Sequence, residues 1–382
     1  MIKVSDKSKC TGCASCASSC PVRCISMKAD AEGFLYPSAD ADACISCGMC
    51  DRPCPAPSEI DPQNRKSYAV RFTEYEPVSS SGGVFSAVAS QILAAGGVVF
   101  GAAYDSELGV KHVAVKDAAD LGRIRGSKYV QSRIGNACEQ VKEALEDGVK
   151  VLFSGTPCQV AGLLDYLEKD YDNLLTVDFA CHGVPSPEVW ARYVTEAGEG
   201  LMNVNFRDKT SGWRKYDVAY IYKDRTVRIR HDKDPYMMLY LQNVNMRPSC
   251  YDCEFRCGGN RSDLTLSDFW AVSKVLPKMD DGRGVSAVIS NTAKGSAALE
   301  SMKCVAGIEM TEIRSEDALN GNGGFTGRIQ VPSGRDAFFA GLDDAGDIRK
   351  HISMYVEKKS YIKDMYDRLH SFLAHVKRSI LR

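Results

Sequence analysis

The sequence predicts a small α+β module built around two runs of cysteines, followed by a larger α/β domain with a mixed sheet and a helical carboxyl end. Three observations predict this architecture. Cysteines at repeated spacings occupy the first 54 residues, strand and helix patterns then alternate, and apolar residues recur at helical spacing near the end of the chain. We therefore divide the chain into residues 1–60, 66–345 and 346–382.

Length and composition limit the class of protein. With 382 residues, 44% of them hydrophobic, the chain can fill the cores of two or three domains. Its 48 basic and 49 acidic residues nearly cancel, so no bulk field recruits nucleic acid. The amino terminus has no apolar signal region, and glycines interrupt the uncharged stretch at residues 84–104. We expect a cytoplasmic protein with no transmembrane segment.

The two cysteine runs share the spacing C-x2-C-x2-C-x3-C-P, which is the bacterial two-cluster ferredoxin pattern. Three thiolates of a run can hold one [4Fe-4S] cluster, while the fourth reaches across to the other. The first cluster is thus assigned Cys10, Cys13, Cys16 and Cys54, and the second Cys44, Cys47, Cys50 and Cys20. Structural zinc sites or disulfides are the alternative, but neither calls for a repeated run that ends in proline.

Cys24 is a ninth cysteine in this region and has no role in the pattern. We expect it to be a spare, buried thiol. In the same module, short strands are expected at residues 2–4 and 35–36. A module of this size has little hydrophobic core, so we expect it to need its clusters in order to fold.

The second domain is expected to begin with a strand at residues 68–70, followed by a Ser/Gly-rich loop at 79–83 and a helix at 84–93. Such a loop at a helix N-terminus offers free backbone N–H groups to a phosphate. A plain helix cap is the more common role of a Ser-Ser-Gly loop. Both interpretations remain open at this point.

A strand, helix, strand unit at residues 149–179 is expected to place its two strands parallel. Cys158 and Cys181 come directly after these strands, at the edge where open α/β sheets bind ligands. Cys250 and Cys253 form a C-x2-C motif in a loop that can reach them. Four thiolates gathered there can hold a third [4Fe-4S] cluster, and a structural zinc ion is the alternative.

Later patterns predict antiparallel strands at residues 217–222 and 226–230 and a last core strand at 285–289. Residues 350–382 carry eight Lys or Arg against three Asp or Glu, and their apolar residues fall on one helical face. This basic amphipathic helix is expected to pack back on the domain, with docking to a partner or a membrane surface as the alternative.

Several short motifs occur in a fixed order behind the cysteine runs: Ser80-Ser81-Gly82-Gly83, Gly126-Ser127-Lys128-Tyr129, Thr156-Pro157-Cys158-Gln159, Cys181-His182-Gly183 and Ser267-Asp268-Phe269-Trp270. Together with the double run, this set resembles the coenzyme F420 hydrogenase/dehydrogenase beta subunit family over residues 1–310. The resemblance implies an FAD-containing iron-sulfur oxidoreductase, with a cluster on the cysteines matching Cys158, Cys181, Cys250 and Cys253 close to the flavin. In archaeal members the flavin reduces or oxidises coenzyme F420, and a plant relative reduces hydroxymethyl chlorophyll.

With this resemblance, the expected fold is an α+β ferredoxin-like two-cluster module followed by an α/β flavin-binding domain with a mixed sheet and a helical C-terminus. The expected cofactor-binding residues are Ser81, Gly82, Gly83, Gly126, Ser127, Lys128, Tyr129 and Thr156. Lys128, His182 and Lys209 are candidates to steady negative charge on a reduced flavin or an acidic substrate. A solvated lysine or a hydrogen-bonded core histidine is an equally good account of each.

The expected reaction converts single electrons into a hydride. A ferredoxin or other redox protein docks near residues 10–54, electrons cross the clusters, and FAD delivers a hydride to coenzyme F420 or a related small molecule. Two alternatives stay open: an electron-transfer subunit that serves a partner enzyme, and a ferredoxin-dependent reductase or dehydrogenase of a non-F420 substrate such as a polysaccharide precursor. A homo-oligomer is compatible with all three. Cys257 is an extra thiol, and either it or Cys253 is the fourth ligand of the third cluster.

Overall fold

The computed structural model describes residues 1–57, 65–257, 259–325 and 327–357. In this part of the chain, the largest sheet has eight strands in the order β13-β3-β12-β11-β7-β6-β4-β5. These strands are β3 (Lys66–Phe72), β4 (Val98–Tyr104), β5 (Val110–Val115), β6 (Val151–Ser154), β7 (Leu174–Phe179), β11 (Leu264–Asp268), β12 (Ser286–Ser290) and β13 (Ile308–Ile313). Neighbours pair parallel from β4 through β6 and β7 to β11, and antiparallel elsewhere. The predicted mixed sheet is confirmed.

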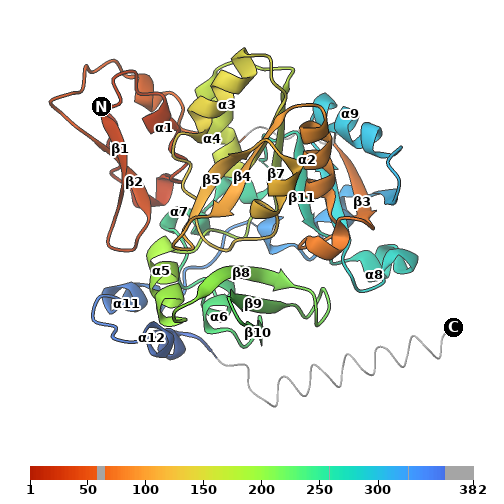
Figure 1. Ribbon diagram of the computed structural model, residues 1–382. Coiled ribbons are helices and arrows are strands. Elements are labelled where there is room, and N and C mark those ends of the chain that lie inside the picture. The colour runs from red at the N-terminus through yellow and green to blue at the C-terminus, as the bar shows by residue number, and fades with distance from the viewer. Residues whose placement is uncertain (58–64, 258, 326, 358–382) are drawn as a thin grey trace.

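Helices cover both faces of this sheet and make three layers (Figure 1). One face carries α2 (Val84–Ala94) and α9 (Ala293–Met302), and the other carries α3 (Ala137–Glu146) and α4 (Pro157–Leu167). Successive residues of β4 alternate between the two cores: Val99 packs on the α2 side, while Val98 and Phe100 pack on the α3 side. The predicted parallel unit is confirmed, because β6 pairs with β7 across α4 with Val151 opposite Leu174.

A second, three-stranded antiparallel sheet lies below the large one in Figure 1. It consists of β8 (Leu201–Asp208), β9 (Asp217–Tyr222) and β10 (Thr226–Arg230). The helices around it are α5 (Pro187–Glu196), α6 (Pro235–Leu241), α11 (Arg335–Ala340) and α12 (Ile348–Tyr355). Its core is aromatic, with the rings of Trp190, Phe206 and Tyr236 tilted against one another at centroid distances of 4.8 to 5.9 Å. The predicted strands at 217–222 and 226–230 are confirmed.

The N-terminal module contains α1 (Ser15–Ser18) and a hairpin of β1 (Ile25–Ala29) and β2 (Leu35–Ala39). The strand predicted at residues 35–36 is confirmed, but the one predicted at 2–4 is wrong, since those residues are irregular. The reason is that β2 pairs with β1 instead, across a turn in which Gly33 has a φ of +82°. Ile2 contributes its side chain to the small cysteine-rich core of the module.

Three further α-helices in the described chain are short: α7 (Pro248–Tyr251), α8 (Val272–Val275) and α10 (Ser315–Leu319). The strand expected to be the last, β12, is followed by β13, which pairs with β3 at the sheet edge. Glu309 and Glu312 make β13 polar, as an edge strand tolerates, so β12 remains the last strand of the core. The helix expected at the carboxyl end lies mostly outside the described residues, which stop at 357, soon after α12.

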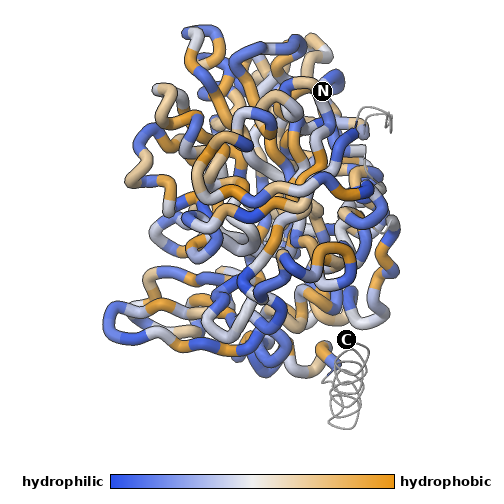
Figure 2. Tube along the Cα trace, turned by 90° about the vertical axis from the view of Figure 1, so that its right-hand side faces the viewer, coloured by the Kyte–Doolittle hydropathy of each residue, from blue (hydrophilic) through white to orange (hydrophobic). Residues whose placement is uncertain are grey.

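Hydropathy follows these layers. Hydrophobic segments run through the interior of the molecule, and hydrophilic segments lie mainly along its outline (Figure 2). No helix in the described part of the chain is long and apolar enough to span a membrane.

Candidate functional site

The four cysteines predicted to hold a third cluster line one cavity, which we call the thiol cavity. Cys158 stands in the first turn of α4, Cys181 follows β7, Cys250 lies in α7 and Cys253 follows α7. The cavity is small, about 30 Å³, and phenylalanines contribute to the rest of its wall. The side chain of Cys257 lies outside the described residues, so the choice between Cys253 and Cys257 remains a prediction.

Burial dominates the chemistry of these thiols. It raises the pKa of Cys181 well above its usual range, and the neighbouring thiols of Cys250, Cys158 and Cys253 add to the effect. Burial likewise raises the pKa of Cys250 to about 12 and that of Cys253 to about 11. Four half-buried thiols that oppose each other's ionisation are suited to a cationic iron site, because bound iron compensates the thiolate charge. The donor set therefore fits an iron-sulfur cluster.

The four thiols of the thiol cavity are not close enough together to bind one metal ion jointly. Among the described residues, no three His, Cys, Asp or Glu side chains gather tightly enough to hold one metal ion. A zinc ion needs thiolates about 2.3 Å from one centre. The zinc ion and the iron-sulfur cluster thus both stay predictions for these cysteines.

The first N-terminal set, Cys10, Cys13, Cys16 and Cys54, faces the thiol cavity. Burial raises the pKa of Cys16 to about 12, and the nearby thiols of Cys10 and Cys54 contribute, so the fourth cysteine of the second run lies beside the first run. Burial also raises the pKa of Cys13, whose charged neighbours include Cys158 of the thiol cavity. Thr11 lines the thiol cavity itself.

The second N-terminal set, Cys20, Cys44, Cys47 and Cys50, lines a separate cavity at the outer end of the module. Cys24 lines it too, so we call it the five-thiol cavity. Cys24 is half-buried, not fully buried as expected, because it packs at the edge of the module's small core, where it also lines this cavity. Its hydrogen bond to Cys20 raises the pKa of the Cys24 thiol to about 11, with a smaller contribution from burial.

A larger cavity, of about 490 Å³, opens between the two sheets. We call it the polar cavity. Its wall comes from the loop before α2, from Gly126, from the end of β8 and from the loop before β12. Its volume is in the range of known cofactor and substrate pockets, roughly 300–1,000 Å³.

Two loops expected to bind a flavin meet at this cavity. The backbone N–H and the hydroxyl of Ser127 both donate to Ser80 Oγ, at 2.9 and 3.1 Å. Ser80 and Gly126 line the cavity, whereas Ser81, Gly82 and Gly83 do not. The N–H of Gly82 donates to Ser286 Oγ, and a Cβ on Gly82 would lie 2.4 Å from the Val70 carbonyl oxygen. Gly82 thus allows the loop to pack directly on the sheet.

Thr156 is the one expected flavin residue that lies at the thiol cavity instead. It begins α4 in a capping box with Gln159, and its Oγ1 lies 3.2 Å from Cys158 Sγ. Its observed contacts are therefore with a candidate cluster ligand, and it does not line the polar cavity.

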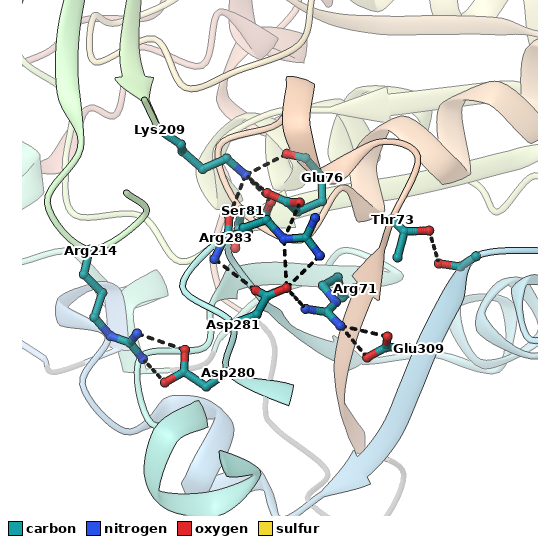
Figure 3. Close-up of polar contacts among 11 residues, drawn as sticks. Arg71, Thr73, Glu76, Ser81, Lys209, Arg214, Asp280, Asp281, Arg283 and Glu309 are labelled. Atoms are coloured by element: carbon teal, nitrogen blue, oxygen red, sulfur yellow. Dashed lines mark hydrogen bonds and ion pairs between the residues drawn. The ribbon is translucent and has the colours of Figure 1, made fainter. Parts of the chain in front are cut away.

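The three expected charge-steadying residues are all engaged by the protein. Lys209 Nζ donates to a Glu76 carboxylate oxygen and to the Glu76, Arg283 and Ser81 carbonyls, as Figure 3 shows for Glu76 and Ser81. Lys128 donates to the carbonyl of Arg125 at 2.9 Å, and burial lowers its pKa to about 8. His182 lies 2.6 Å from Asn243 Oδ1, and burial lowers its pKa.

Arg207 was missed by the sequence reasoning. It lines the polar cavity, is only 5% exposed, and its Nη1 donates to Asp268 at 2.9 Å and to the Tyr129 hydroxyl at 3.4 Å. Its Nε and Nη2 have no hydrogen-bond partner among the described residues. The available signal was the Asp268-Phe269-Trp270 motif, because Asp268 also accepts from Trp213 and so holds the arginine in place.

The two cavities are joined by one short stretch of chain. Gly126 lines the polar cavity and Gln131 lines the thiol cavity, so at most about 18 Å of backbone separates their Cα atoms. Aromatic rings run alongside: Tyr240 packs 4.9 Å from Tyr129 and 5.2 Å from His182, which follows Cys181.

Two protein families match parts of this chain. Residues 148–316 match the family described as the C terminus of the coenzyme F420 hydrogenase/dehydrogenase beta subunit, and residues 9–57 match the 4Fe-4S dicluster domain. No curated protein matched the chain. Among solved structures, the chain is similar to a chain of the F420-reducing [NiFe] hydrogenase complex from Methanosarcina barkeri, with 17% identity, a TM-score of 0.45, and coverage of 78% of this chain and 92% of that one.

The dicluster match contains both cysteine runs, and the beta subunit match contains all four cysteines of the thiol cavity. With its 4Fe-4S dicluster domain at residues 9–57, the chain is an iron-sulfur electron-transfer protein that is related, through residues 148–316, to the coenzyme F420 hydrogenase/dehydrogenase beta subunit family.

Proposed function

We propose that the chain is an iron-sulfur flavoprotein oxidoreductase. It passes electrons between a ferredoxin-type redox protein and FAD, and so reduces or oxidises coenzyme F420 or a related small molecule. The observation that carries this proposal is the pair of cavities joined by residues 126–131, one lined by four thiols and the other large and polar. A protein that converts single electrons into a hydride needs a cluster site and a flavin site next to each other.

The twelve cysteines keep their assigned roles in this proposal. The second set binds the outer cluster, the first set the middle cluster, and Cys158, Cys181, Cys250 and Cys253 the inner cluster. The support is their order in space, since Cys16 is close to Cys50 on one side and Cys13 is close to Cys158 on the other. Residues 1–60 would thus be the electron-entry domain and residues 66–345 the flavin domain.

FAD would lie in the polar cavity and convert between one-electron and two-electron transfer. The bonds between Ser80 and Ser127 fix the two loops at its edge. Arg207, a buried donor held by Asp268 at the wall of this cavity, would place positive charge near any negative charge there, a role first expected of Lys128, His182 or Lys209. Buried donors of this kind act strongly because they need little reorganisation.

Electrons would enter at the five-thiol cavity. Cys47 is exposed there, and the apolar side chains of Met1, Val22 and Ile45 that line the cavity are 56%, 42% and 60% exposed. Apolar side chains gathered beside a cluster are suited to brief docking of a small redox protein.

The test is an iron and flavin count on protein purified and reconstituted without oxygen. We expect about twelve irons and one FAD per chain, about eight irons in Cys158→Ser, and no loss in the control Cys304→Ser, whose thiol is exposed and lies at none of the three cavities. About eight irons without flavin in the unaltered protein would overturn the flavoenzyme proposal.

The substrate is tested next, with reduced ferredoxin as donor and coenzyme F420 as acceptor. Turnover that depends on bound FAD supports the F420 reaction. A loaded protein that leaves F420 unchanged contradicts this choice of substrate, and screening then turns to the other two candidates, a non-F420 substrate or a partner enzyme fed with electrons.

A further inference from the structure

Arg247 is a fully buried arginine at the contact between the N-terminal module and the large domain. It precedes α7, and its guanidinium reaches into the module, where Nε donates to the Cys10 carbonyl at 2.8 Å and Nη2 to the Leu35 carbonyl at 3.0 Å. Nη1 donates to Gln131 Oε1 at 3.1 Å, on the side of the large domain. The side chain thus contacts both parts of the protein.

The charge of Arg247 has no carboxylate to balance it. Among the described residues, none of the acidic side chains forms an ion pair with it; its partners are two carbonyls, an amide and a thiol. The ring of Tyr36 lies 4.2 Å from its guanidinium carbon. A buried cation without a counter-ion is costly, so a negative charge is expected close by.

The negative charges available are those of two clusters. Nη2 lies 3.7 Å from Cys10 Sγ, in the set assigned to the middle cluster. The guanidinium is also close enough to Cys158 and Cys250, in the set assigned to the inner cluster, to act on both thiols. A cubane held by four thiolates is anionic and gains a further negative charge on reduction, so a nearby cation favours the reduced form.

We propose that Arg247 sets the reduction potentials of the middle and inner clusters, acting as their shared counter-ion and as a hydrogen-bond donor to Cys10. The inference rests on the proposed function, because it takes the clusters to be bound by the assigned cysteines. In each step one electron moves between clusters and no bond forms or breaks. Arg247 raises both potentials above that of the outer cluster, so an electron given by a reduced ferredoxin is drawn inward.

A second buried arginine provides a matched control. Arg335 also joins the module to the large domain, by donating to the Glu32 carboxylate and to the Met246 carbonyl at 3.1 Å. It is 6% exposed, but it has a carboxylate partner and none of its hydrogen bonds goes to a thiol. A residue that acts only as a tether between the two parts should behave like Arg335.

The experiment is a redox titration of the reconstituted holoenzyme, followed by electron paramagnetic resonance, for the unaltered protein, Arg247→Gln, Arg247→Lys and Arg335→Gln. In Arg247→Gln we expect the reduced-to-oxidised ratio of the middle and inner clusters, measured at a fixed solution potential, to fall at least tenfold. This fall corresponds to a lowering of their reduction potentials by about 59 mV. The outer cluster is the internal reference and should not move. Arg247→Lys should recover part of the shift, and Arg335→Gln should show none.

The inference is overturned by unchanged middle and inner potentials, by an equal shift of all three clusters, or by the same shift in Arg335→Gln. If Arg247→Gln does not load iron, Arg247→Lys decides: a partial fall of the middle and inner potentials, with the outer potential unmoved, supports the inference, and potentials equal to those of the unaltered protein, or loss of clusters in this charged variant too, refute it. Fewer than three clusters in the unaltered protein would instead contradict the proposed function itself.

Discussion

The Sγ atom of Cys24 lies 3.5 Å from the Sγ atom of Cys20, and the backbone N–H of Cys24 donates to the same Cys20 sulfur at 3.4 Å. Burial alone would raise the pKa of Cys20, but these two bonds, together with backbone hydrogen bonds from Val22 and Arg23, lower it below its usual value. Cys24 is therefore placed to support Cys20 as a thiolate, a role that the spacing pattern did not assign.

Replacing Cys24 tests this relationship. We expect Cys24→Ala to keep about twelve irons but to lower the potential of the outer cluster, because one donor to Cys20 is lost. A hydrogen bond worth about 1 kcal/mol corresponds to a roughly fivefold change in the reduced-to-oxidised ratio. Cys24→Ser, which keeps a donor, should stay close to the unaltered protein. Loss of about four irons in Cys24→Ala would instead identify Cys24 as a ligand.

Arg207 gives the second prediction. Arg207→Met removes a positive charge from the wall of the polar cavity, and we expect flavin or substrate to bind about 10- to 100-fold more weakly, since a hydrogen bond to a charged group is worth roughly 1.5–3 kcal/mol. Equilibrium binding of FAD to the iron-loaded protein, followed by fluorescence, measures this. Arg214→Met is the control, because Arg214 pairs with Asp280 outside the cavity wall (Figure 3). Equal losses in both variants would contradict the assigned role.

The electron-entry surface gives the third prediction. Ile45→Glu adds a carboxylate to an exposed apolar side chain at the five-thiol cavity, and we expect the KM for reduced ferredoxin to rise about tenfold, or roughly 1.4 kcal/mol, with iron content unchanged. Val331 is similarly exposed, at 51%, and lies at none of the three cavities. A KM that is unchanged in Ile45→Glu, or that rises equally in Val331→Glu, argues against docking at this surface.

Gly162 gives the fourth prediction, which concerns the contact between module and domain. It lies in α4, where Ser15 Oγ donates to its carbonyl at 2.7 Å and an added Cβ would lie 3.0 Å from Cys13 Sγ. Gly162→Val should therefore push the module away, cost about 1–3 kcal/mol in stability, and slow reduction of the inner cluster in rapid mixing with reduced ferredoxin. Gly122→Val, where a Cβ meets nothing within 4 Å, should leave this rate unchanged.

His112 gives the fifth prediction. Burial, with help from the charge of Lys128, lowers the pKa of His112 to about 4, while its hydrogen bond to the Ser154 carbonyl opposes the shift. The unfolded chain binds a proton near pH 6.5, so the stability that His112 contributes is present above that pH and is lost as the pH falls toward 4. Between pH 8 and 5.5 this loss is about 1.4 kcal/mol. Urea unfolding should show a flatter pH dependence in His112→Gln; an identical slope would contradict the assignment.

The sequence predicted what depends on spacing and periodicity. The cysteine runs, the parallel pair β6 and β7, and the convergence of Cys158 with Cys250 follow from patterns within short stretches. Whether a charged side chain is buried, however, cannot be predicted from such local patterns. Nothing local distinguishes Arg207 from Lys209, yet the lysine is bound by Glu76, 133 residues away, while the arginine is bound by Asp268, 61 residues away.

The same limit applies to Arg247. It precedes Pro248 and appears in the sequence as an ordinary loop residue, while its partners are Cys10 and Leu35 in the module. Such contacts join segments more than 200 residues apart, and only the folded chain brings them together.

The origin of the inner thiols has a consequence for how the protein is made. Cys158 and Cys181 follow two different strands, whereas Cys250 and Cys253 arrive with α7, after the whole second sheet has been synthesised. The eight cysteines of the two N-terminal runs, by contrast, lie within 45 residues of sequence and can gather as soon as they leave the ribosome. If the proposed clusters are bound, maturation should therefore be staged, with the inner iron site completed last.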